Sequence, residues 1–284
     1  MSVAATEHVA SVAEQVERAN RSGRKPAVLI HGLWLLPNSW ERWAALFEQA
    51  GFSAVMAAWP DDPQTVAAAR SHPEIFARKS IGQIADYIAG AVRKLDDRPA
   101  MVGHSFGGLL AQILAGRGLS AATVAIDPAP FRGVLPLPFS ALKSASPVLL
   151  NPANRGRAVS LTYESFHYGW TNAISDGEGR RLFAEYHVPG AGMPIFQAAM
   201  ANVNPWTEVK VDTKNPDRGP LLIIEGDADH TVPWAMAEAA YRRQKRNPGV
   251  TEMQRMPNRG HSLVIDGGWR EVADAALAFL KRFL

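Results

Sequence analysis

The chain has 284 residues, of which 47% are hydrophobic and 20% are charged, a balance typical of a globular protein with a substantial core and not of a disordered chain. Its formal net charge is +3, but the lysines and arginines are scattered singly, which argues against a nucleic-acid-binding surface. The absence of cysteine excludes disulfides, a cysteine nucleophile and thiolate metal ligands.

The first 23 residues carry charges among alanines and valines and lack the apolar core of a signal peptide. No other segment has the apolar length needed to cross a bilayer. We therefore expect a soluble, cytoplasmic protein with no membrane partner.

Short apolar runs alternate with segments of helical periodicity along most of the chain. In chain order, the pattern predicts helix 6–20, strand 26–31, helix 39–50 capped by Ser39, strand 53–59, helix 80–95, strand 100–103, helix 106–117, strand 122–126, strand 221–225, helix 233–246, strand 251–256 and helix 268–283. Strand followed by helix, repeated, predicts an α/β fold with a mostly parallel central sheet and helices on both faces.

The alternation is interrupted between residues 127 and 219, where prolines are frequent and no clear strand is visible. A segment of this length is too long for a structureless loop inside a compact domain. We expect it to form a small, mostly helical cap above the sheet. The predicted core domain is 1–129 together with 217–284, and the predicted cap insertion is 130–216.

The pentapeptide Gly103-His104-Ser105-Phe106-Gly107 joins a predicted strand to a predicted helix. This strand, sharp turn and helix lift a serine hydroxyl above a sheet, and side chains at positions 103 and 107 would collide with neighbouring backbone. The bare Gly-x-Ser-x-Gly pattern is weak alone. Its position at a strand-to-helix junction makes Ser105 a candidate nucleophile.

From residue 26 to the end, the sequence resembles the α/β-hydrolase superfamily. His31-Gly32-Leu33-Trp34 follows the first strand, where the family places its oxyanion loop. Gly226-Asp227-Ala228-Asp229 and Gly260-His261-Ser262 follow later strands, where the family keeps its acid and its base. Many members have two antiparallel strands before the first of these strands, but the corresponding residues here look helical, so we expect the sheet to lack them.

The resemblance implies a catalytic triad in which Ser105 is the nucleophile, His261 the base and Asp229 the acid. Histidine suits this role because its unperturbed pKa lies near neutrality, and the aspartate would hold the imidazole tautomer. The backbone N–H groups of Leu33 and Phe106 would form the oxyanion hole.

Other residues are candidates for the same roles. Asp227 lies two positions before Asp229 and could be the acid, and Asp127 follows the strand before the cap, where some family members carry it. His230 is a rival base, although its adjacency to Asp229 makes it a poor geometric partner. No His-Glu-x-x-His or Gly-x-Gly-x-x-Gly pattern occurs, so we expect neither a metal nor a cofactor.

Large apolar side chains are frequent in the cap and after the oxyanion loop. Most of them should pack the cap onto the sheet, but together they favour an apolar pocket for a small, uncharged carbonyl compound. The predicted pocket residues are Trp34, His104, Phe139, Phe166, Met193 and Phe196.

The expected function is therefore hydrolysis of an ester, lactone or similar bond of a small, largely apolar substrate through an acyl-enzyme, as in carboxylesterases and lipases. The stretch 31–43 is also similar to cofactor-free haloperoxidase-like and carbon–carbon-cleaving relatives, which use the same triad, and fold alone does not separate these chemistries. A second alternative is a non-catalytic small-molecule-binding protein on the same fold.

Overall fold

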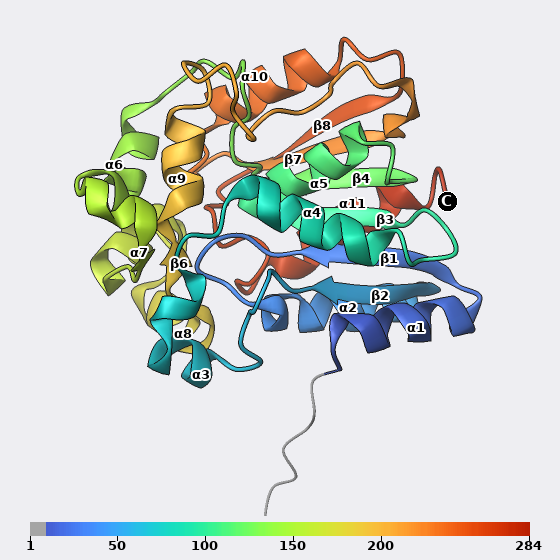
Figure 1. Ribbon diagram of the computed structural model, residues 1–284, viewed down its shortest axis with the longest axis horizontal. Helices are drawn as coiled ribbons and strands as arrows, with labels where there is room; N and C mark the ends of the chain where they lie inside the picture. Colours follow the sequence, from blue (N-terminus) through green and yellow to red (C-terminus); the bar gives the residue numbers. More distant parts are fainter. Residues whose placement is uncertain (1–9) are drawn as a thin grey trace, which may run out of the picture.

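The computed structural model describes residues 10–284, and its centre is a six-stranded sheet in which all neighbouring strands are parallel (Figure 1). The strand order is β2-β1-β3-β4-β7-β8. The strands are β1 (Lys25–Ile30), β2 (Phe52–Ala57), β3 (Ala100–His104), β4 (Ala122–Ile126), β7 (Leu221–Gly226) and β8 (Thr251–Met256). The predicted fold class, α/β with a mostly parallel sheet, is confirmed.

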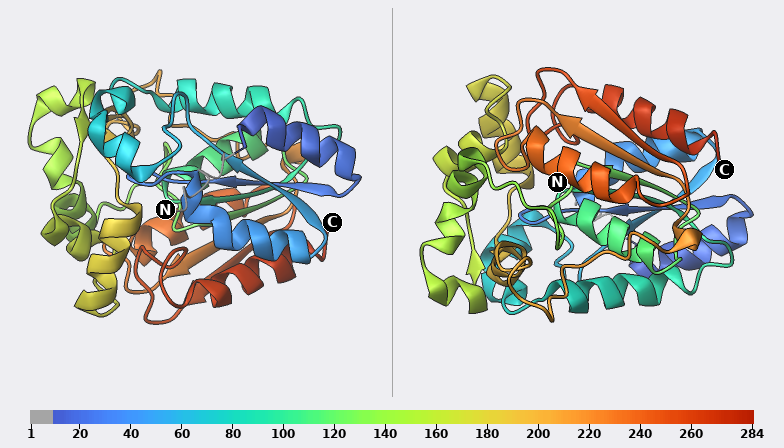
Figure 2. Two further views of the ribbon diagram at one scale, coloured as in Figure 1. Left: turned by 90° about the horizontal axis from the view of Figure 1, so that it is seen from below. Right: turned by 90° about the horizontal axis from the view of Figure 1, so that it is seen from above.

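Helices cover both faces of the sheet, which explains why its central strands are continuous apolar runs (Figure 2). One face is covered by α2 (Glu41–Gln49) and α11 (Trp269–Leu280), whose Trp43 and Trp269 rings lie 6.3 Å apart. The other face carries α1 (Val12–Ser22), α4 (Ile81–Val92), α5 (Phe106–Gly116) and α10 (Trp234–Gln244).

Two connections before β3 differ from the predicted pattern. Ser39 does not cap a helix: it lies in the 3-10 turn η1 (Pro37–Trp40), its hydroxyl donates to the carbonyl of Leu36, and α2 begins at Glu41. The proline-rich loop after β2 contains the helix α3 (Val66–Ser71) and the 3-10 turn η2 (Pro73–Phe76). These short elements have too few residues to show a hydrophobic period in the sequence.

The predicted absence of the first two antiparallel strands holds for the described residues, because α1 is the only element there before β1. Strand β2 therefore forms an edge of the sheet. Side chains of α1 satisfy this edge: Gln15 Oε1 accepts a hydrogen bond from Met56 N at 2.8 Å, and Arg18 donates to the Ala54 carbonyl at 2.9 Å. The predicted start of this helix at residue 6 lies outside the described residues, and Ser11 caps α1.

Between β4 and β7 the chain leaves the sheet and forms a group of helices at one end of the molecule (Figures 1 and 2). These are α6 (Phe139–Leu149), α7 (Tyr163–Gly169), α8 (Asp176–Tyr186) and α9 (Gly192–Ala199), with the short 3-10 turn η3 (Pro152–Gly156). A further 3-10 turn, η4 (Pro216–Arg218), precedes β7 and lies against the C-terminal end of α5, away from this group. A two-stranded antiparallel ribbon joins β5 (Ala158–Val159) to β6 (Gly190–Ala191), and strands of two residues leave no pattern in the sequence. Among the described residues, no helix has the length and apolar character to cross a membrane.

Candidate active site

Ser105 lies at the turn between β3 and α5 with φ of 56° and ψ of −121°, a left-handed conformation that is strained for a residue with a side chain. The glycines on either side allow this turn. A Cβ on Gly103 would overlap the carbonyl of Gly107, and a Cβ on Gly107 would overlap the carbonyl of Ile30 in β1. The side chain of Ser105 is thereby presented above the carboxyl ends of the strands.

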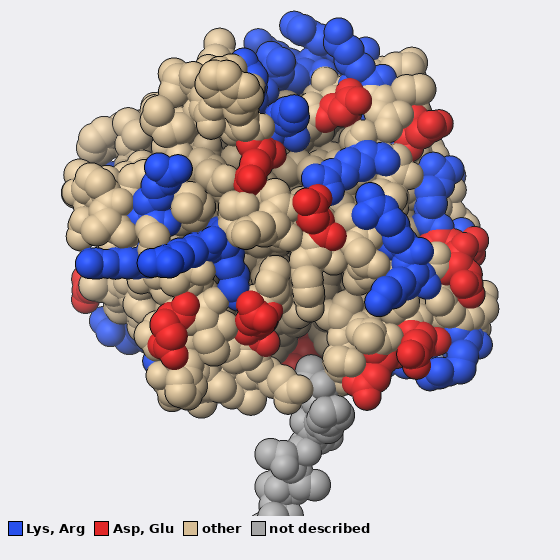
Figure 3. Space-filling view, viewed as in Figure 1, with Lys and Arg blue, Asp and Glu red and all other residues tan. Residues whose placement is uncertain are grey.

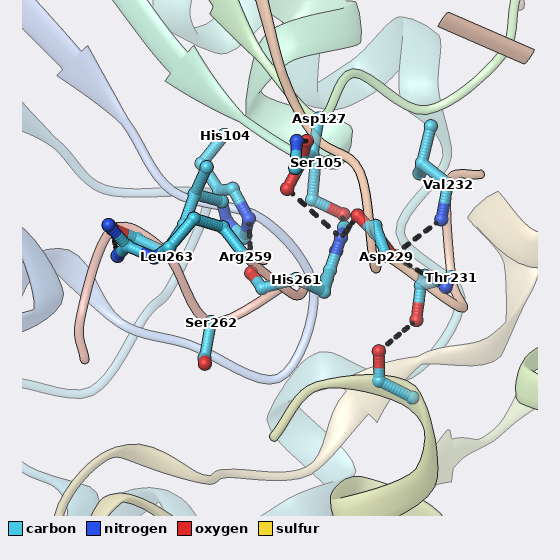
Figure 4. A network of polar contacts seen from close by, with 12 residues as sticks. His104, Ser105, Asp127, Asp229, Thr231, Val232, Arg259, His261, Ser262 and Leu263 are labelled. Carbon is cyan, nitrogen blue, oxygen red and sulfur yellow. Dashed lines mark hydrogen bonds and ion pairs between the residues drawn. The ribbon is translucent and has the colours of Figure 1, made fainter. Parts of the chain in front are cut away.

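Ser105, His261 and Asp229 form a continuous hydrogen-bonded chain (Figure 4). His261 Nε2 lies 2.9 Å from Ser105 Oγ, and His261 Nδ1 lies 2.6 Å from Asp229 Oδ2. The other carboxylate oxygen of Asp229 accepts from the backbone N–H groups of Thr231 at 2.6 Å and Val232 at 2.9 Å. A carboxylate fixed in this way holds the Nδ1–H tautomer, which leaves Nε2 free to accept the serine proton.

Two aromatic residues enclose the His261 ring. Trp170 meets it edge-on with ring centroids 4.7 Å apart, and His104 lies 4.6 Å away on another side. His104 Nε2 donates to the backbone carbonyl of His261 at 2.9 Å. Burial, reinforced by His261, holds the pKa of His104 well below its usual range, so His104 is a neutral support for the loop that carries His261.

Asp127 is a second buried carboxyl group beside His261, but it is not the hydrogen-bond partner. Its Oδ2 lies 3.9 Å from His261 Nδ1, while its Oδ1 accepts from the N–H of Gly226 at 2.8 Å. Burial raises the pKa of Asp127 well above its usual range, and the nearby Asp229 and Glu225 carboxylates act in the same direction. Burial also raises the pKa of Glu225 to about 8.

The other rival residues point away from the serine. Asp227 accepts from the N–H of Asn258 at 2.6 Å and pairs with Arg255 at 3.5 Å. His230 donates from Nδ1 to the carbonyl of Tyr168 at 2.9 Å. Among the three candidate acids, Asp229 is the one that hydrogen-bonds to His261, and among the candidate bases, His261 is the one that hydrogen-bonds to Ser105.

The loop after β1 passes directly against the nucleophile. A Cβ on Gly32 would lie 2.8 Å from the Cβ of Ser105, so only glycine allows this approach. Within residues 10–284, the backbone N–H groups of Leu33 and Phe106 have no hydrogen-bond acceptor, which leaves both available to an oxyanion.

Trp34 connects this loop to the cap. Its indole Nε1 donates to the carbonyl of Val159 at 2.9 Å, and its own carbonyl accepts from the N–H of Val188 at 3.0 Å. Trp34 itself has a φ of 63°. The residue next to Leu33 is therefore hydrogen-bonded both to β5 and to the segment that precedes β6.

An apolar cavity of about 120 Å³ lies between the cap and Ser105. It contains no charged side chain, and its polar side chains are Ser105, Ser144 and Thr231. The remaining lining residues are Trp34, Phe106, Ala129, Pro130, Leu137, Ala141, Leu142, Ala145, Leu149, Ile195, Ala198, Ala199, Val232 and Met236.

Of the predicted pocket residues, Trp34 lines this cavity and the other five do not. Helix α9 contributes Ile195, Ala198 and Ala199, which lie on a different side of the helix from the predicted Met193 and Phe196. Phe139 is 78% exposed at the start of α6. Phe166 is fully buried and stacks on Trp170, and His104 lies under the His261 loop.

Two supporting residues had no signal in the sequence. Asp62 accepts from the N–H of Trp59 at 2.7 Å and lies 2.9 Å from Nε2 of His31, whose Nδ1 donates to the carbonyl of Gly32. Trp170 shields His261 from the cap side. Both lie in loops or short helices far from the motifs they support.

His104, Asp127 and His261 have ligand atoms within 4.8 Å of one another, a spacing that a metal ion could use. Both ring nitrogens of His261 already hold Ser105 and Asp229, so a metal there would have to displace the hydrogen-bonded chain.

A parallel sheet with a helical insertion, and a serine at a strained strand-to-helix turn, together define the hydrolase class of α/β proteins. The chain belongs to the alpha/beta hydrolase family, whose model matches residues 27–275. No curated protein matches the sequence.

Solved structures with the same fold include three hydrolases. The monoacylglycerol lipase of Paleococcus ferrophilus is 18% identical, with 91% of this chain and 95% of that chain covered and a TM-score of 0.62. Polyneuridine aldehyde esterase is 17% identical (90% and 99% covered, TM-score 0.62). A pyrethroid hydrolase from Sphingobium faniae JZ-2 is 17% identical (90% and 97% covered, TM-score 0.64). At these identities the similarity shows a common fold.

Proposed function

We propose that this protein is a serine hydrolase that cleaves an ester, lactone or similar carbonyl bond of a small, largely apolar substrate through an acyl-enzyme. The observation that carries the proposal is the buried chain of hydrogen bonds from Ser105 through His261 to Asp229, next to the apolar cavity. This arrangement supplies a nucleophile, a general base and an orienting carboxylate in one place.

In the proposed reaction, Ser105 Oγ attacks the substrate carbonyl carbon while His261 Nε2 takes the hydroxyl proton. The negative charge that develops on the carbonyl oxygen is held by the N–H groups of Leu33 and Phe106, and Asp229 stabilises the imidazolium. The imidazolium then protonates the leaving alcohol, which departs and leaves the acyl-enzyme. Water repeats the sequence, with His261 again as the base, and releases the acid.

The cavity favours an uncharged substrate. Because no charged side chain lines it, a carboxylate or ammonium group inside would be desolvated without a partner. Its volume of about 120 Å³ suits a short acyl or alcohol portion, with the rest of a larger substrate extending toward the cap opening. The similar structures include a lipase and an esterase, which also favours ester bonds.

Labelling with a fluorophosphonate probe, followed by a panel of chromogenic esters of increasing chain length, tests the proposal. We expect covalent labelling of Ser105, loss of label in Ser105→Ala, and slow labelling in His261→Ala. Ester turnover should fall by roughly 10³-fold or more in Ser105→Ala, because triad members act as a unit, while its melting temperature stays near the wild-type value.

Three outcomes would contradict the proposal. Near-normal turnover by Ser105→Ala would exclude Ser105 as the nucleophile. Absence of labelling in the wild-type protein favours a small-molecule-binding protein. Inert esters combined with turnover of a vinylogous diketone, or with formation of a peracid, favour carbon–carbon cleavage or haloperoxidase-like chemistry.

A further inference from the structure

The outer side of the cap exposes a row of large apolar side chains. Leu135 is 74% exposed, Phe139 78% and Leu150 83%. With three neighbours they form a surface that we call the cap rim, consisting of Leu135, Leu137, Phe139, Leu142, Leu150 and Met200. Exposed apolar groups that gather in this way mark an interaction surface more often than isolated ones do.

Helical spacing places part of the cap rim on one stripe of α6. Phe139, Leu142 and Lys143 are three and four residues apart and all are exposed, while Ala141 and Val148 are buried on the opposite side. Helix α6 lies at the outer end of the molecule in both orientations of the ribbon (Figures 1 and 2). This exposed stripe is therefore not covered by another element of the chain.

The cap rim is continuous with the substrate cavity. Leu137 is 62% exposed and Leu142 is 41% exposed, yet both also line the cavity that reaches Ser105. The loop before α6 is fastened to the segment after α9, because Asn202 donates to the Val134 carbonyl at 2.8 Å. The apolar surface thus borders the cavity at Leu137 and Leu142.

The two stretches of chain that carry the cap rim contain basic residues and no acidic residue, although the neighbouring helix α7 carries the exposed Glu164. Residues 128–163 contain Arg132, Lys143, Arg155 and Arg157 and no aspartate or glutamate, and residues 188–207 contain no charged side chain. At the chain's average of 27 acidic residues in 284, about five would be expected in these two stretches. In Figure 3, the upper left of the molecule, where α6 lies in Figure 1, is tan and blue.

We propose that the cap rim docks on a lipid surface that carries anionic headgroups, with the mouth of the cavity facing the lipid. Apolar side chains would enter the boundary between headgroups and acyl chains, and the flanking lysine and arginines would contact the headgroups. A second copy of this chain suits the surface less well, because two such rims would place positive charges against each other.

This contact is peripheral and requires no spanning segment. The sequence-based expectation of no membrane partner rested on the lack of such a segment, which does not bear on a docked surface. A lipophilic substrate dissolved in the lipid could pass along Leu137 and Leu142 to Ser105 without crossing water. Docking does not require catalysis, so the two proposals can be tested independently.

Flotation of the full-length protein with lipid vesicles tests the inference. We expect binding to vesicles of phosphatidylcholine mixed with phosphatidylglycerol and little binding to phosphatidylcholine alone. The double variant Leu135→Ser, Phe139→Ser should bind about tenfold more weakly or worse, since neither residue can then enter the acyl boundary. The double variant Lys143→Gln, Arg155→Gln should also bind vesicles about tenfold more weakly, and added salt should weaken vesicle binding by the wild-type protein in the same way.

Matched controls lie away from the cap. Val250→Ser removes an exposed apolar side chain and Arg246→Gln with Lys281→Gln removes two exposed charges, and both should leave flotation unchanged. Ser105→Ala should bind vesicles as the wild-type protein does, which separates docking from catalysis. Equal binding to both vesicle types, or rim variants that float like the wild type, would overturn the proposal. So would a dimer in sedimentation that the rim variants dissociate while no vesicle binds.

Discussion

At the scale of single residues, two buried carboxyl groups face the same ring nitrogen of His261 from different distances. Asp229 Oδ2 lies 2.6 Å from Nδ1 and Asp127 Oδ2 lies 3.9 Å from it. Burial raises the pKa of Asp127, which favours its protonated form, whereas Asp229 accepts two backbone hydrogen bonds in addition to its contact with His261. We infer that only Asp229 acts as the acid of the triad.

Substitution of each carboxyl group by its amide separates these roles. Asp229→Asn should lower kcat/KM by about 10⁴-fold, because an amide in that position favours the wrong imidazole tautomer. Asp127→Asn should stay within about tenfold of the wild-type value, since a neutral group with an acceptor for the Gly226 N–H is retained. Steady-state kinetics across a pH series measure both effects, and the reverse ranking would assign the acid role to Asp127.

At the scale of elements, the loop after β1 must approach the turn before α5 closely enough to bring two N–H groups together. Gly32→Ala adds a methyl group about 2.8 Å from the Cβ of Ser105, so the loop has to move. We expect kcat to fall by about 10²-fold or more with a smaller change in KM, because the oxyanion donor at Leu33 is displaced.

Gly90→Ala is the matched control for this change, because a Cβ at Gly90 in α4 meets no atom within 4 Å. It should keep full activity and gain a little stability from the better helix propensity of alanine. Circular dichroism and thermal melting establish that both variants are folded. Equal activity of Gly32→Ala and the wild-type protein would remove the loop from the proposed oxyanion hole.

Elements with a strong period were predicted from the sequence, and elements set by contacts with distant residues were not. Strand 122–126 lies where its apolar run predicted it, and strand 251–256 also lies where it was expected, although its sequence is mostly polar. The ribbon of β5 and β6 was not predicted, because a strand of two residues is too short to show a hydrophobic period. In α9, the sequence alone does not tell which side of the helix meets the cavity, so it predicts Met193 and Phe196 where the structure has Ile195 and Ala198.

At the scale of the whole molecule, buried Glu225 makes the stability of the fold depend on pH. Burial raises the pKa of Glu225 from 4.5 to about 8, so the folded protein keeps a proton that the unfolded chain releases above about pH 4.5. The stability associated with the neutral form is present below that value and is lost as pH rises toward about 8. The loss is at most about 1.4 kcal/mol per pH unit in this window.

Urea unfolding between pH 5 and 8 measures this dependence. The free energy of unfolding of the wild-type protein should decrease as pH rises, and Glu225→Gln should flatten the decrease because the amide has no proton to lose. Glu252→Gln is a suitable control, since Glu252 is a surface residue that pairs with Arg282. Parallel pH dependences for wild type and Glu225→Gln would show that Glu225 ionises freely in the folded protein.

In the proposed reaction, the two hydrogen bonds that join Trp34 to β5 and to the segment before β6 link substrate admission to turnover. Leu33, whose N–H group is the proposed oxyanion donor, precedes Trp34 directly in the chain, so opening of the cap on that side would displace this N–H group. A bulky substrate that forces the cap open would therefore lose transition-state stabilisation in addition to binding energy. Discrimination between substrates by size would then appear in kcat as well as in KM. With the cap open, the enzyme would be inactive.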